Sequence, residues 1–314
     1  MRRVAPEPRP AAAASSAPRR RRNRVHRRLR RWQKVYTPRT FASRPLHELR
    51  WLVRGEAALE RWTDERLAFG NHFWLFVLGL NNSGTSILAH VLETHPLIRS
   101  LPAEGQALTR ALPTGAELGV RRNWTARLDD FHWTGESAPE AARRARYDWA
   151  FYLDRRPGIV LEKSPPNSVR SRWLQAFFAP SRFLAIVRHP YAVCEGMRRR
   201  GGFALEDAAR HWARGNGTML ADARELDRFR LVTYEEFCAE PHRVLAGVEA
   251  FLELEQPIDR AALDEPLPSH TIDRTTARLQ DYNARSLERL SPEEIASINE
   301  IVAPVARTLG YELR

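Results

Sequence analysis

The sequence predicts a three-layer α/β fold, with a central, mainly parallel sheet of four to five strands flanked by helices. Three observations predict it. Short apolar runs of strand length alternate with longer segments of helical periodicity. The runs are apolar at nearly every position, which is typical of parallel strands that helices cover on both faces. The unusual polar clusters follow these runs, and ligands of parallel sheets bind at the carboxyl ends of the strands.

The expected elements begin with a helix over 46–67, after which strands and helices alternate. The strands are expected at 73–80, 158–162, 182–187 and 229–233. The helices are expected at 85–94, at 168–178, from 191, and over 205–226, 244–254 and 292–309.

The net charge of +12 is concentrated at the N-terminus. Residues 1–31 hold twelve arginines and one acid, so they carry +11 and leave about +1 for residues 32–314. A nearly neutral folded part does not indicate a nucleic-acid-binding surface. We therefore expect a disordered basic tail over 1–31, a helical lead-in over 32–71 and one P-loop-type domain over 72–314.

The basic tail leaves three interpretations open: a solvated extension, a segment that contacts anionic surfaces such as RNA, lipid or an acidic partner, or a cleaved targeting segment. No run approaches the ~18 apolar residues of a membrane span. Cys194 and Cys238 are too few for a disulfide framework and favour a reducing compartment. We expect a soluble, cytoplasmic protein without a transmembrane segment or a structural zinc site.

A loop of small residues, Gly-Leu-Asn-Asn-Ser-Gly-Thr-Ser at 79–86, joins the first expected strand to its helix. Backbone N–H groups converge in such a loop, and the helix dipole favours an anion. Its spacing matches the ATP loop G-x-x-x-x-G-K-[ST], hence a P-loop-type fold, but Thr85 replaces the lysine. The loop therefore suits a shorter anion than a triphosphate; the alternative is a tight turn whose glycines serve packing.

Together with Leu88 and His95-Pro96, this loop resembles the 5′-phosphosulfate loop of PAPS-dependent sulfotransferases, in particular the branch with tyrosylprotein sulfotransferases and bacterial relatives. The resemblance extends over 72–314. It implies a nucleotide sulfate donor, 3′-phosphoadenosine 5′-phosphosulfate (PAPS), and an acceptor hydroxyl. It also implies donor binding by Asn82, Ser83, Gly84, Thr85 and Ser86. Loops of the family usually carry Arg or Lys where this chain has Asn82, so another group must neutralise the phosphosulfate.

A second anion site is expected after the strand at 182–187. Arg188, followed by a proline and a helix, can hold a phosphate through a fork contact, or form a surface ion pair. In sulfotransferases the matching segment grips the 3′-phosphate of the nucleotide, which implies that role for Arg188. The serine of the family motif is Gly196 here, so one hydroxyl contact is missing. Arg200 lies where relatives often place a further cation, although it also fits a solvated helix face.

Two further residues resemble parts of the nucleotide site. Tyr234, in Thr-Tyr-Glu-Glu after the strand at 229–233, matches a tyrosine that lies near the adenine in sulfotransferases; a core aromatic that closes a strand is the alternative. Ser286 lies near the position of a serine that approaches the nucleotide in the family's closing segment.

The resemblance also implies the catalytic residues. Sulfuryl transfer needs a cation near the bridging oxygen of the leaving group and a base for the acceptor hydroxyl. Lys163, in Glu-Lys-Ser-Pro, matches the lysine that contacts the sulfuryl donor, and it is the only lysine beyond Lys34. Glu104 matches the catalytic glutamate, one or two residues further from His95-Pro96 than in the family; a carboxylate favoured by a helix dipole is the alternative. Glu162 and His189 are weaker candidates for the base. No metal is expected.

Two other functions stay open. A P-loop phosphotransferase or NTPase would need the loop lysine and a strand-end aspartate for Mg²⁺, and neither is evident. A non-catalytic nucleotide-binding protein with a basic tail would tolerate Asn82 and Gly196. The acceptor could be a carbohydrate, a phenol, a lipid or a peptide, and we expect Trp124, Phe131 and Trp133 to form part of its pocket.

Overall fold

The computed structural model describes residues 38–67, 73–153, 158–264 and 279–314. Residues 47–314 form one compact unit. The described residues before it, 38–46, belong to the first part of helix α2 (Pro38–Val53). The basic tail at 1–31 lies outside the described residues, so its character stays a prediction.

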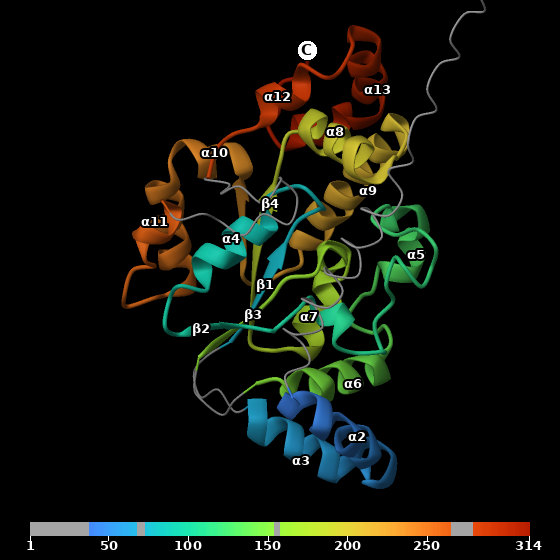
Figure 1. The fold of residues 1–314 in the computed structure, drawn as a ribbon, viewed down its shortest axis with the longest axis vertical. Coiled ribbons are helices and arrows are strands. Elements are labelled where there is room, and N and C mark those ends of the chain that lie inside the picture. Colours follow the sequence, from blue (N-terminus) through green and yellow to red (C-terminus); the bar gives the residue numbers. More distant parts are fainter. Residues whose placement is uncertain (1–37, 68–72, 154–157, 265–278) are drawn as a thin grey trace, which may run out of the picture. The chain divides into compact units, whose positions relative to one another are not determined.

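Five parallel strands form the central sheet, in the order β2-β3-β1-β4-β5 (Figure 1). Their bounds are β1 (Trp74–Leu78), β2 (Ile98–Ser100), β3 (Ile159–Glu162), β4 (Ser181–Val187) and β5 (Phe229–Thr233). The predicted fold class is confirmed, and the four predicted strands agree with the structure to within two residues at each end. Strand β2 was missed because it is short and contains Arg99 and Ser100, which give no apolar run.

The strand order reverses at β1. From β1 the chain passes to the edge strand β2 and returns to β3, and it then places β4 and β5 on the other side of β1. The carboxyl ends of β1, β3, β4 and β5 lie at the same edge because all pairs are parallel. Ligands of open parallel sheets bind at this edge, beside such a reversal.

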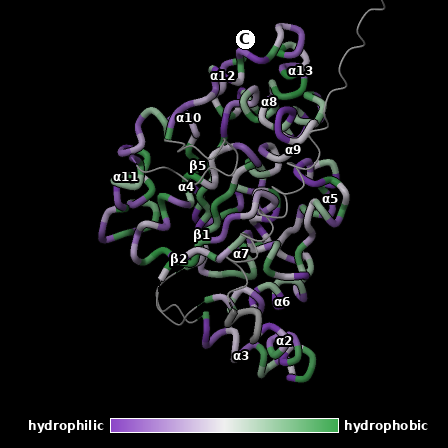
Figure 2. Tube along the Cα trace, in the orientation of Figure 1, coloured by the Kyte–Doolittle hydropathy of each residue, from purple (hydrophilic) through white to green (hydrophobic). Residues whose placement is uncertain are grey.

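Different helices cover the two faces of the sheet (Figure 1). Leu75 and Val77 of β1 pack in one buried cluster with residues of α4 (Thr85–Leu92), α10 (Tyr234–Ala239) and α11 (Pro241–Leu252). Trp74 and Phe76 alternate with them and make edge-on contacts with Phe178 at the end of α7 (Ser171–Phe177). The alternation follows from the two-residue period of a strand. Figure 2 shows hydrophobic residues concentrated along these central strands.

A second buried cluster joins α8 (Pro190–Gly201), α9 (Leu205–Ala223) and α13 (Pro292–Thr308). Helix α8 begins directly after β4, and Pro190 occupies its first turn, where the missing N–H costs nothing. The structure also has the helices α5 (Leu128–Phe131), α6 (Pro139–Ala150) and α12 (Asn283–Leu287), with short 3₁₀ helices at Gly105–Ala107, Trp124–Arg127, Pro165–Val169 and Arg260–Leu263.

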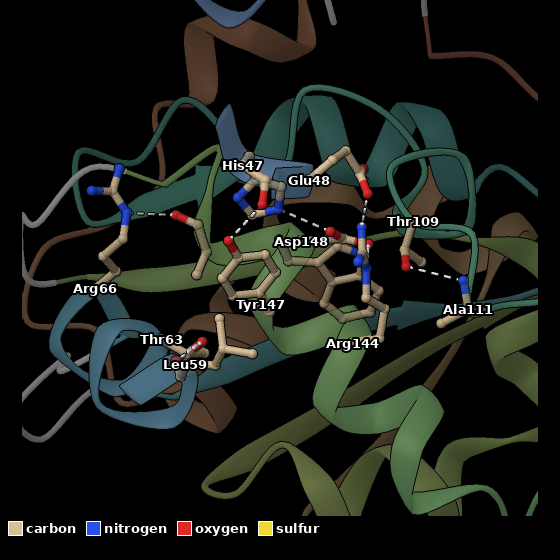
Figure 3. A network of polar contacts seen from close by, with 12 residues as sticks. His47, Glu48, Leu59, Thr63, Arg66, Thr109, Ala111, Arg144, Tyr147 and Asp148 are labelled. Atoms are coloured by element: carbon tan, nitrogen blue, oxygen red, sulfur yellow. Dashed lines mark hydrogen bonds and ion pairs between the residues drawn. The ribbon is translucent and has the colours of Figure 1, made fainter. Parts of the chain in front are cut away.

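The predicted single helix over 46–67 is wrong, because the chain breaks at 54–55 into α2 and α3 (Glu56–Leu67). Gly55 at the break disfavours a continuous helix. His47 of α2 lies against α6, where its Nε2 is 2.9 Å from Asp148 Oδ1 and its ring stacks on Tyr147 (Figure 3). Arg144 bridges Asp148 and Glu48. Burial alone would raise the pKa of Asp148, but its hydrogen bonds with His47 and Arg144 hold that pKa below its ordinary value. This network attaches the C-terminal part of α2 to the domain.

A buried histidine predicts a pH dependence of stability. His211 of α9 is fully buried beside Thr125, and burial lowers its pKa from 6.5 to about 3. In the unfolded chain the His211 imidazole takes up a proton as the pH falls below about 6.5, whereas in the folded chain it does so only near pH 3. The free energy of unfolding should therefore fall by up to about 1.4 kcal/mol per pH unit as the pH drops through this range.

Urea unfolding of His211→Gln and wild type at pH 7, 6, 5 and 4 measures this contribution. The stability difference between the two proteins should shift in favour of the variant as the pH falls. His242→Gln, which removes an exposed imidazole, is the matched control. A difference that is constant across the four pH values would contradict the assignment.

Candidate active site

The loop at 79–84 turns tightly between β1 and α4. Gly79 and Gly84 adopt φ values of 146° and 98°, and Asn82 also has a positive φ of 74°. A Cβ at Gly79 would lie 2.5 Å from the Ile186 carbonyl oxygen, and one at Gly84 would lie 2.7 Å from the Tyr234 ring. Both glycines are therefore required by conformation and by space.

Two side-chain donors of this loop have no partner among the described residues. They are the buried Ser83 hydroxyl and the Asn82 amide nitrogen, Nδ2. The N-terminus of α4, which begins at Thr85, lies next to them. Buried polar groups are nearly always hydrogen-bonded in folded proteins, so unpaired donors beside a helix N-terminus fit a bound anion.

Lys163, Ser86 and Glu104 meet at the carboxyl edge of the sheet. Lys163 directly follows β3, the neighbour of β1, and its Nζ donates to Ser86 Oγ at 3.2 Å. The same Nζ lies 3.7 Å from Glu104 Oε1. Both the ammonium and the carboxylate are partly exposed. The structure thus brings together a cation, a carboxylate and the start of the phosphate loop.

Buried Glu162 holds the two segments that carry Glu104 and Lys163. Its carboxylate accepts the Gly105 N–H at 2.7 Å and bonds from the side chains of Ser164 and Asn167. The Gly105 carbonyl in turn accepts the Trp149 indole N–H at 3.0 Å. Gly105, the residue after Glu104, is therefore held through both its N–H and its carbonyl group.

A buried cation accompanies this carboxylate. Arg170 is fully buried, and its Nε donates to Asn167 Oδ1 at 2.8 Å. Burial lowers the pKa of Arg170 to about 10, while the charge of Glu162 acts in the opposite direction. Burial also raises the pKa of Glu162, against its hydrogen bonds and Arg170. Glu162 is thus enclosed by internal partners and is unsuited to act as a base on a substrate.

Arg188 lies at the end of β4, on the other side of β1. Its NH1 donates to the Asn82 carbonyl oxygen at 3.1 Å and its Nε to Asn283 Oδ1 at 2.8 Å. Its guanidinium also lies over the Tyr234 ring, 4.1 Å from the centroid. Tyr234 is buried, and its hydroxyl donates to the Gln280 carbonyl. Burial raises the pKa of Tyr234, so it stays a neutral platform under Arg188.

Two more arginines reach the same part of the loop. Arg200 of α8 donates to Asn82 Oδ1 at 2.5 Å, and Arg122 approaches the same oxygen at 3.5 Å. With Arg188, three guanidinium groups surround Asn82. None of them contacts a carboxylate of the described residues. Three cations without carboxylate partners, beside unpaired loop donors, make a site for a multiply charged anion.

This geometry agrees with the match to known proteins. A family model described as "Sulfotransferase family" matches residues 75–258, which is more than half of the chain. The chain belongs to the sulfotransferase family. The matched residues include the phosphate loop, Lys163, Arg188 and Arg200 of this site, whereas Asn283 lies beyond them.

Individual sulfotransferases are distant in sequence. Protein-tyrosine sulfotransferase 2 of Gallus gallus is 27% identical over 194 residues, which cover 57% of this chain and 50% of that protein. The chain thus spans about half the length of this curated relative. The sulfotransferase domain of the Synechococcus PCC 7002 olefin synthase has a TM-score of 0.53 at 21% identity, covering 78% of this chain and 96% of that one. Sulfotransferase STF9 of Mycobacterium avium has a TM-score of 0.50 at 16% identity, covering 81% and 82%. These structures share the fold.

Most of the residues predicted from the sulfotransferase motifs converge in the structure. The loop residues, Lys163 and Glu104 lie together, and Arg188, Arg200, Tyr234 and Gly196 surround the loop on the β4 side. Ser286 of α12 is separate in its contacts, because its buried hydroxyl donates to Glu195 at 3.2 Å. Its role at the nucleotide stays a prediction.

The two histidines that the motifs contain serve the fold. His95 is buried, and its Nε2 lies 3.1 Å from the Gln256 carbonyl oxygen. His189 caps α8, and its Nε2 lies 3.1 Å from the Glu312 carbonyl oxygen. Burial lowers the pKa of His189. These contacts make His189 a structural residue rather than a base.

Sequence reasoning missed Arg122 and Asn283. Arg122 lies in a stretch without periodicity, and nothing in the sequence links it to Asn82. Asn283 belongs to the segment that resembles the family's closing segment, in which the resemblance points to Ser286. Asn283 holds the Arg188 guanidinium and is held in turn by Glu235. The polar character of Asn283 within that segment could have indicated it as a site residue. For Arg122 the sequence contains no such indication.

The expected acceptor pocket needs correction. Trp124 and Phe131 are buried in the cluster of α8 and α9, where Trp124 packs edge-on against His211. They are core residues, so they do not line an acceptor site in this structure. Trp133 is half-buried and packs edge-on against Trp173. These aromatics serve packing, which the residue type alone does not separate from ligand binding.

Within residues 38–67, 73–153, 158–264 and 279–314, none of the helices has the length and apolar character of a membrane span. The same residues contain no group of three or more His, Cys, Asp or Glu side chains that could hold a metal ion.

Proposed function

We propose that this chain transfers a sulfuryl group from PAPS to an acceptor hydroxyl. In this reaction the bond between sulfur and the bridging oxygen of PAPS breaks, and a bond from sulfur to the acceptor oxygen forms. The products are the sulfate ester, 3′-phosphoadenosine 5′-phosphate (PAP) and one proton. The observation that carries the proposal is the pairing of two cation sites, Lys163 on one side of the loop and Arg188 with Arg200 on the other.

The two sites fit a donor that carries charge at both ends. The loop donors, Ser86 and Lys163 suit the phosphosulfate end, and Arg188 with Arg200 suits the 3′-phosphate. Arg188 and Arg200 contact no carboxylate in the part of the chain that the structure describes. An anion would therefore find these cations available instead of competing with internal ion pairs.

The roles of Lys163 and Glu104 follow from their positions. Lys163 stabilises the negative charge that develops on the leaving-group oxygen. Glu104 accepts the proton of the acceptor hydroxyl, and its carboxylate lies 3.7 Å from the Lys163 ammonium. Gln106, which donates to the other Glu104 oxygen at 2.9 Å, leaves Oε1 directed toward the lysine. The base and the cation thus flank one point at the end of the sheet.

A phosphotransferase or NTPase fits less well. Thr85 stands where such an enzyme has its loop lysine, and β1, β3, β4 and β5 are followed by Gly79, Lys163, Arg188 and Tyr234 instead of an aspartate for Mg²⁺. A non-catalytic nucleotide-binding protein would bind PAP as the proposed enzyme does. Only the absence of sulfate transfer would distinguish it from the enzyme.

Nucleotide binding by the full chain tests the proposal. PAP should bind at least about tenfold more tightly than ATP in isothermal titration calorimetry, because the loop and Arg188 suit two separated phosphates rather than a triphosphate. Single-stranded RNA, titrated in parallel, reports binding through the basic tail. Equal affinity for PAP and ATP, or RNA binding without PAP binding, would contradict the proposed donor.

Sulfate transfer from labelled PAPS to a panel of hydroxyl compounds identifies the acceptor class. The panel should contain carbohydrates, phenols, lipids and tyrosine-containing peptides, the last because the Gallus gallus relative is named a protein-tyrosine sulfotransferase. Binding of PAP without transfer to any member would favour the non-catalytic alternative. Cytoplasmic location and contacts of the basic tail with anionic surfaces stay predictions of the sequence.

A further inference from the structure

Asn82, which stands where the family usually has Arg or Lys, is the centre of a cluster of three arginines. Its Oδ1 accepts a hydrogen bond from Arg200 at 2.5 Å and one from Arg122 at 3.5 Å. Its backbone carbonyl accepts a bond from Arg188 at 3.1 Å. The three arginines come from different parts of the chain, a loop before η2 (Trp124–Arg127), the end of β4 and the helix α8. One neutral residue therefore gathers three cations.

The orientation of the Asn82 amide follows from these bonds. Both arginine donors approach Oδ1, so Nδ2 points the other way, toward Gly196 of α8. A Cβ at Gly196 would lie 3.2 Å from Nδ2, which is closer than ordinary van der Waals contact. The two departures from the sulfotransferase motif, Asn82 and Gly196, are thus neighbours, and a serine at 196 would press on the amide that orients the arginines.

Arg122 is held in place by its own loop. Arg121 adopts a φ of 47°, and its N–H donates to the Gly115 carbonyl. A Cβ at Gly115 would lie 1.9 Å from the Arg121 carbonyl oxygen, so this closure requires the glycine. After Arg122, the buried Trp124 anchors the chain in the core. The backbone on both sides of Arg122 is therefore defined, while its side chain is only half-buried.

The electrostatics of the cluster call for a dianion. Burial and the charges of Arg199, Arg122 and Arg188 lower the pKa of Arg200 to about 10. Like charges that are brought together and partly desolvated repel one another, and a bound phosphate monoester reverses that cost. Arg200 Nε is also buried and has no hydrogen-bond partner among the described residues.

We propose that Arg122 is a third cation of the 3′-phosphate site and that Asn82 is the positioning residue that holds Arg122 and Arg200 together there. The inference rests on the proposed function, because the ligand it names is the 3′-phosphate of the donor nucleotide.

Comparison of PAP with adenosine 5′-monophosphate (AMP) isolates the 3′-phosphate, which only PAP carries. Arg122→Ala should weaken PAP binding about 10- to 100-fold and leave AMP binding within about twofold, as expected for one charged hydrogen-bond donor. Arg121→Ala removes the same charge from the adjacent, exposed residue and should change neither affinity. Circular dichroism confirms that each variant is folded.

The positioning role of Asn82 is tested by a double-variant cycle. Asn82→Gly adopts the positive φ of 74° without strain and removes the acceptor, so Arg122 loses its anchor. Arg122→Ala should then cost less than about threefold in PAP affinity in the Asn82→Gly background, against about tenfold or more in wild type. Asn82→Asp, which keeps an oxygen at Oδ1, should retain the coupling between positions 82 and 122.

The outcomes separate this inference from the proposed function. If wild type binds PAP no better than AMP, the proposed donor is wrong. If wild type prefers PAP and Arg122→Ala preserves that preference, or lowers PAP and AMP binding by the same factor, the role of Arg122 is overturned while the donor stands. If the costs of Arg122→Ala are equal in both backgrounds, Asn82 does not position it.

Discussion

Lys163→Met is expected to lower kcat by about 10²- to 10³-fold, because it removes the cation that we propose stabilises the charge on the leaving oxygen. Methionine keeps the length of the side chain but cannot donate to Ser86, which the Lys163 ammonium does at 3.2 Å. PAP binding should stay within about threefold of wild type, because an interaction made mainly in the transition state affects kcat more than ground-state binding. Transfer of label from PAPS and PAP calorimetry measure the two effects.

Lys163→Arg is the companion variant. It keeps the charge but has a longer, planar head group, so it should recover only part of the activity. Lys34→Ala, which removes the other lysine of the chain, is the control for loss of one positive charge and should leave kcat unchanged. Full activity of Lys163→Met with any accepted hydroxyl compound would exclude Lys163 as the leaving-group cation.

Glu162→Gln is expected to lower the free energy of unfolding by about 1–3 kcal/mol, because it disturbs a buried hydrogen-bonded acceptor and removes the negative charge that favours the ionised form of the buried Arg170. The glutamine amide would also place a donor among the donors from Gly105, Ser164 and Asn167. We expect kcat to fall as well, since Gly105 is the residue after Glu104. Urea unfolding and PAPS turnover measure the two effects.

A second variant separates stability from positioning. Glu162→Met combined with Arg170→Met removes both charges, so it should recover the part of the lost stability that comes from the uncompensated charge of Arg170, but not the part that comes from the lost hydrogen bonds. It does not restore an acceptor for the Gly105 N–H, so kcat should stay low. Glu225→Gln, which breaks the surface pair with Arg172, is the control and should cost at most about 1 kcal/mol. Recovery of kcat together with stability in the double variant would remove the positioning role.

The sequence predicted the central strands well because their apolar runs are unambiguous. Strands β1 and β4 are buried along nearly their whole length, and a parallel strand covered on both faces leaves that signature. Strand β2 left none, because its three residues are held by pairing with β3 rather than by their own composition. The break of the first helix at Gly55 was also hidden, since the apolar spacing continues across it.

The site residues also divide into those that a local pattern indicates and those that only long-range contacts bring to the site. Lys163 and Arg188 were found because each directly follows a strand, and parallel neighbours end at the same edge of a sheet. Arg122 and Asn283 lie 40 and 95 residues from the side chains that they contact, in segments without a periodic pattern. The aromatics Trp124 and Phe131 were assigned to a pocket, because an apolar ring serves a core and a binding site equally well in one dimension.

By itself the sequence determined the α/β class and predicted an anion-binding loop at 79–86 and cations at the strand ends, because these depend on local backbone chemistry and on the short period of buried strands. Only the tertiary structure decided which side chains surround Asn82, how Glu162 anchors the segment of Glu104, and which aromatics are core. Those contacts join residues far apart in the chain, and their geometry depends on how the helices pack on the sheet, which no local pattern encodes.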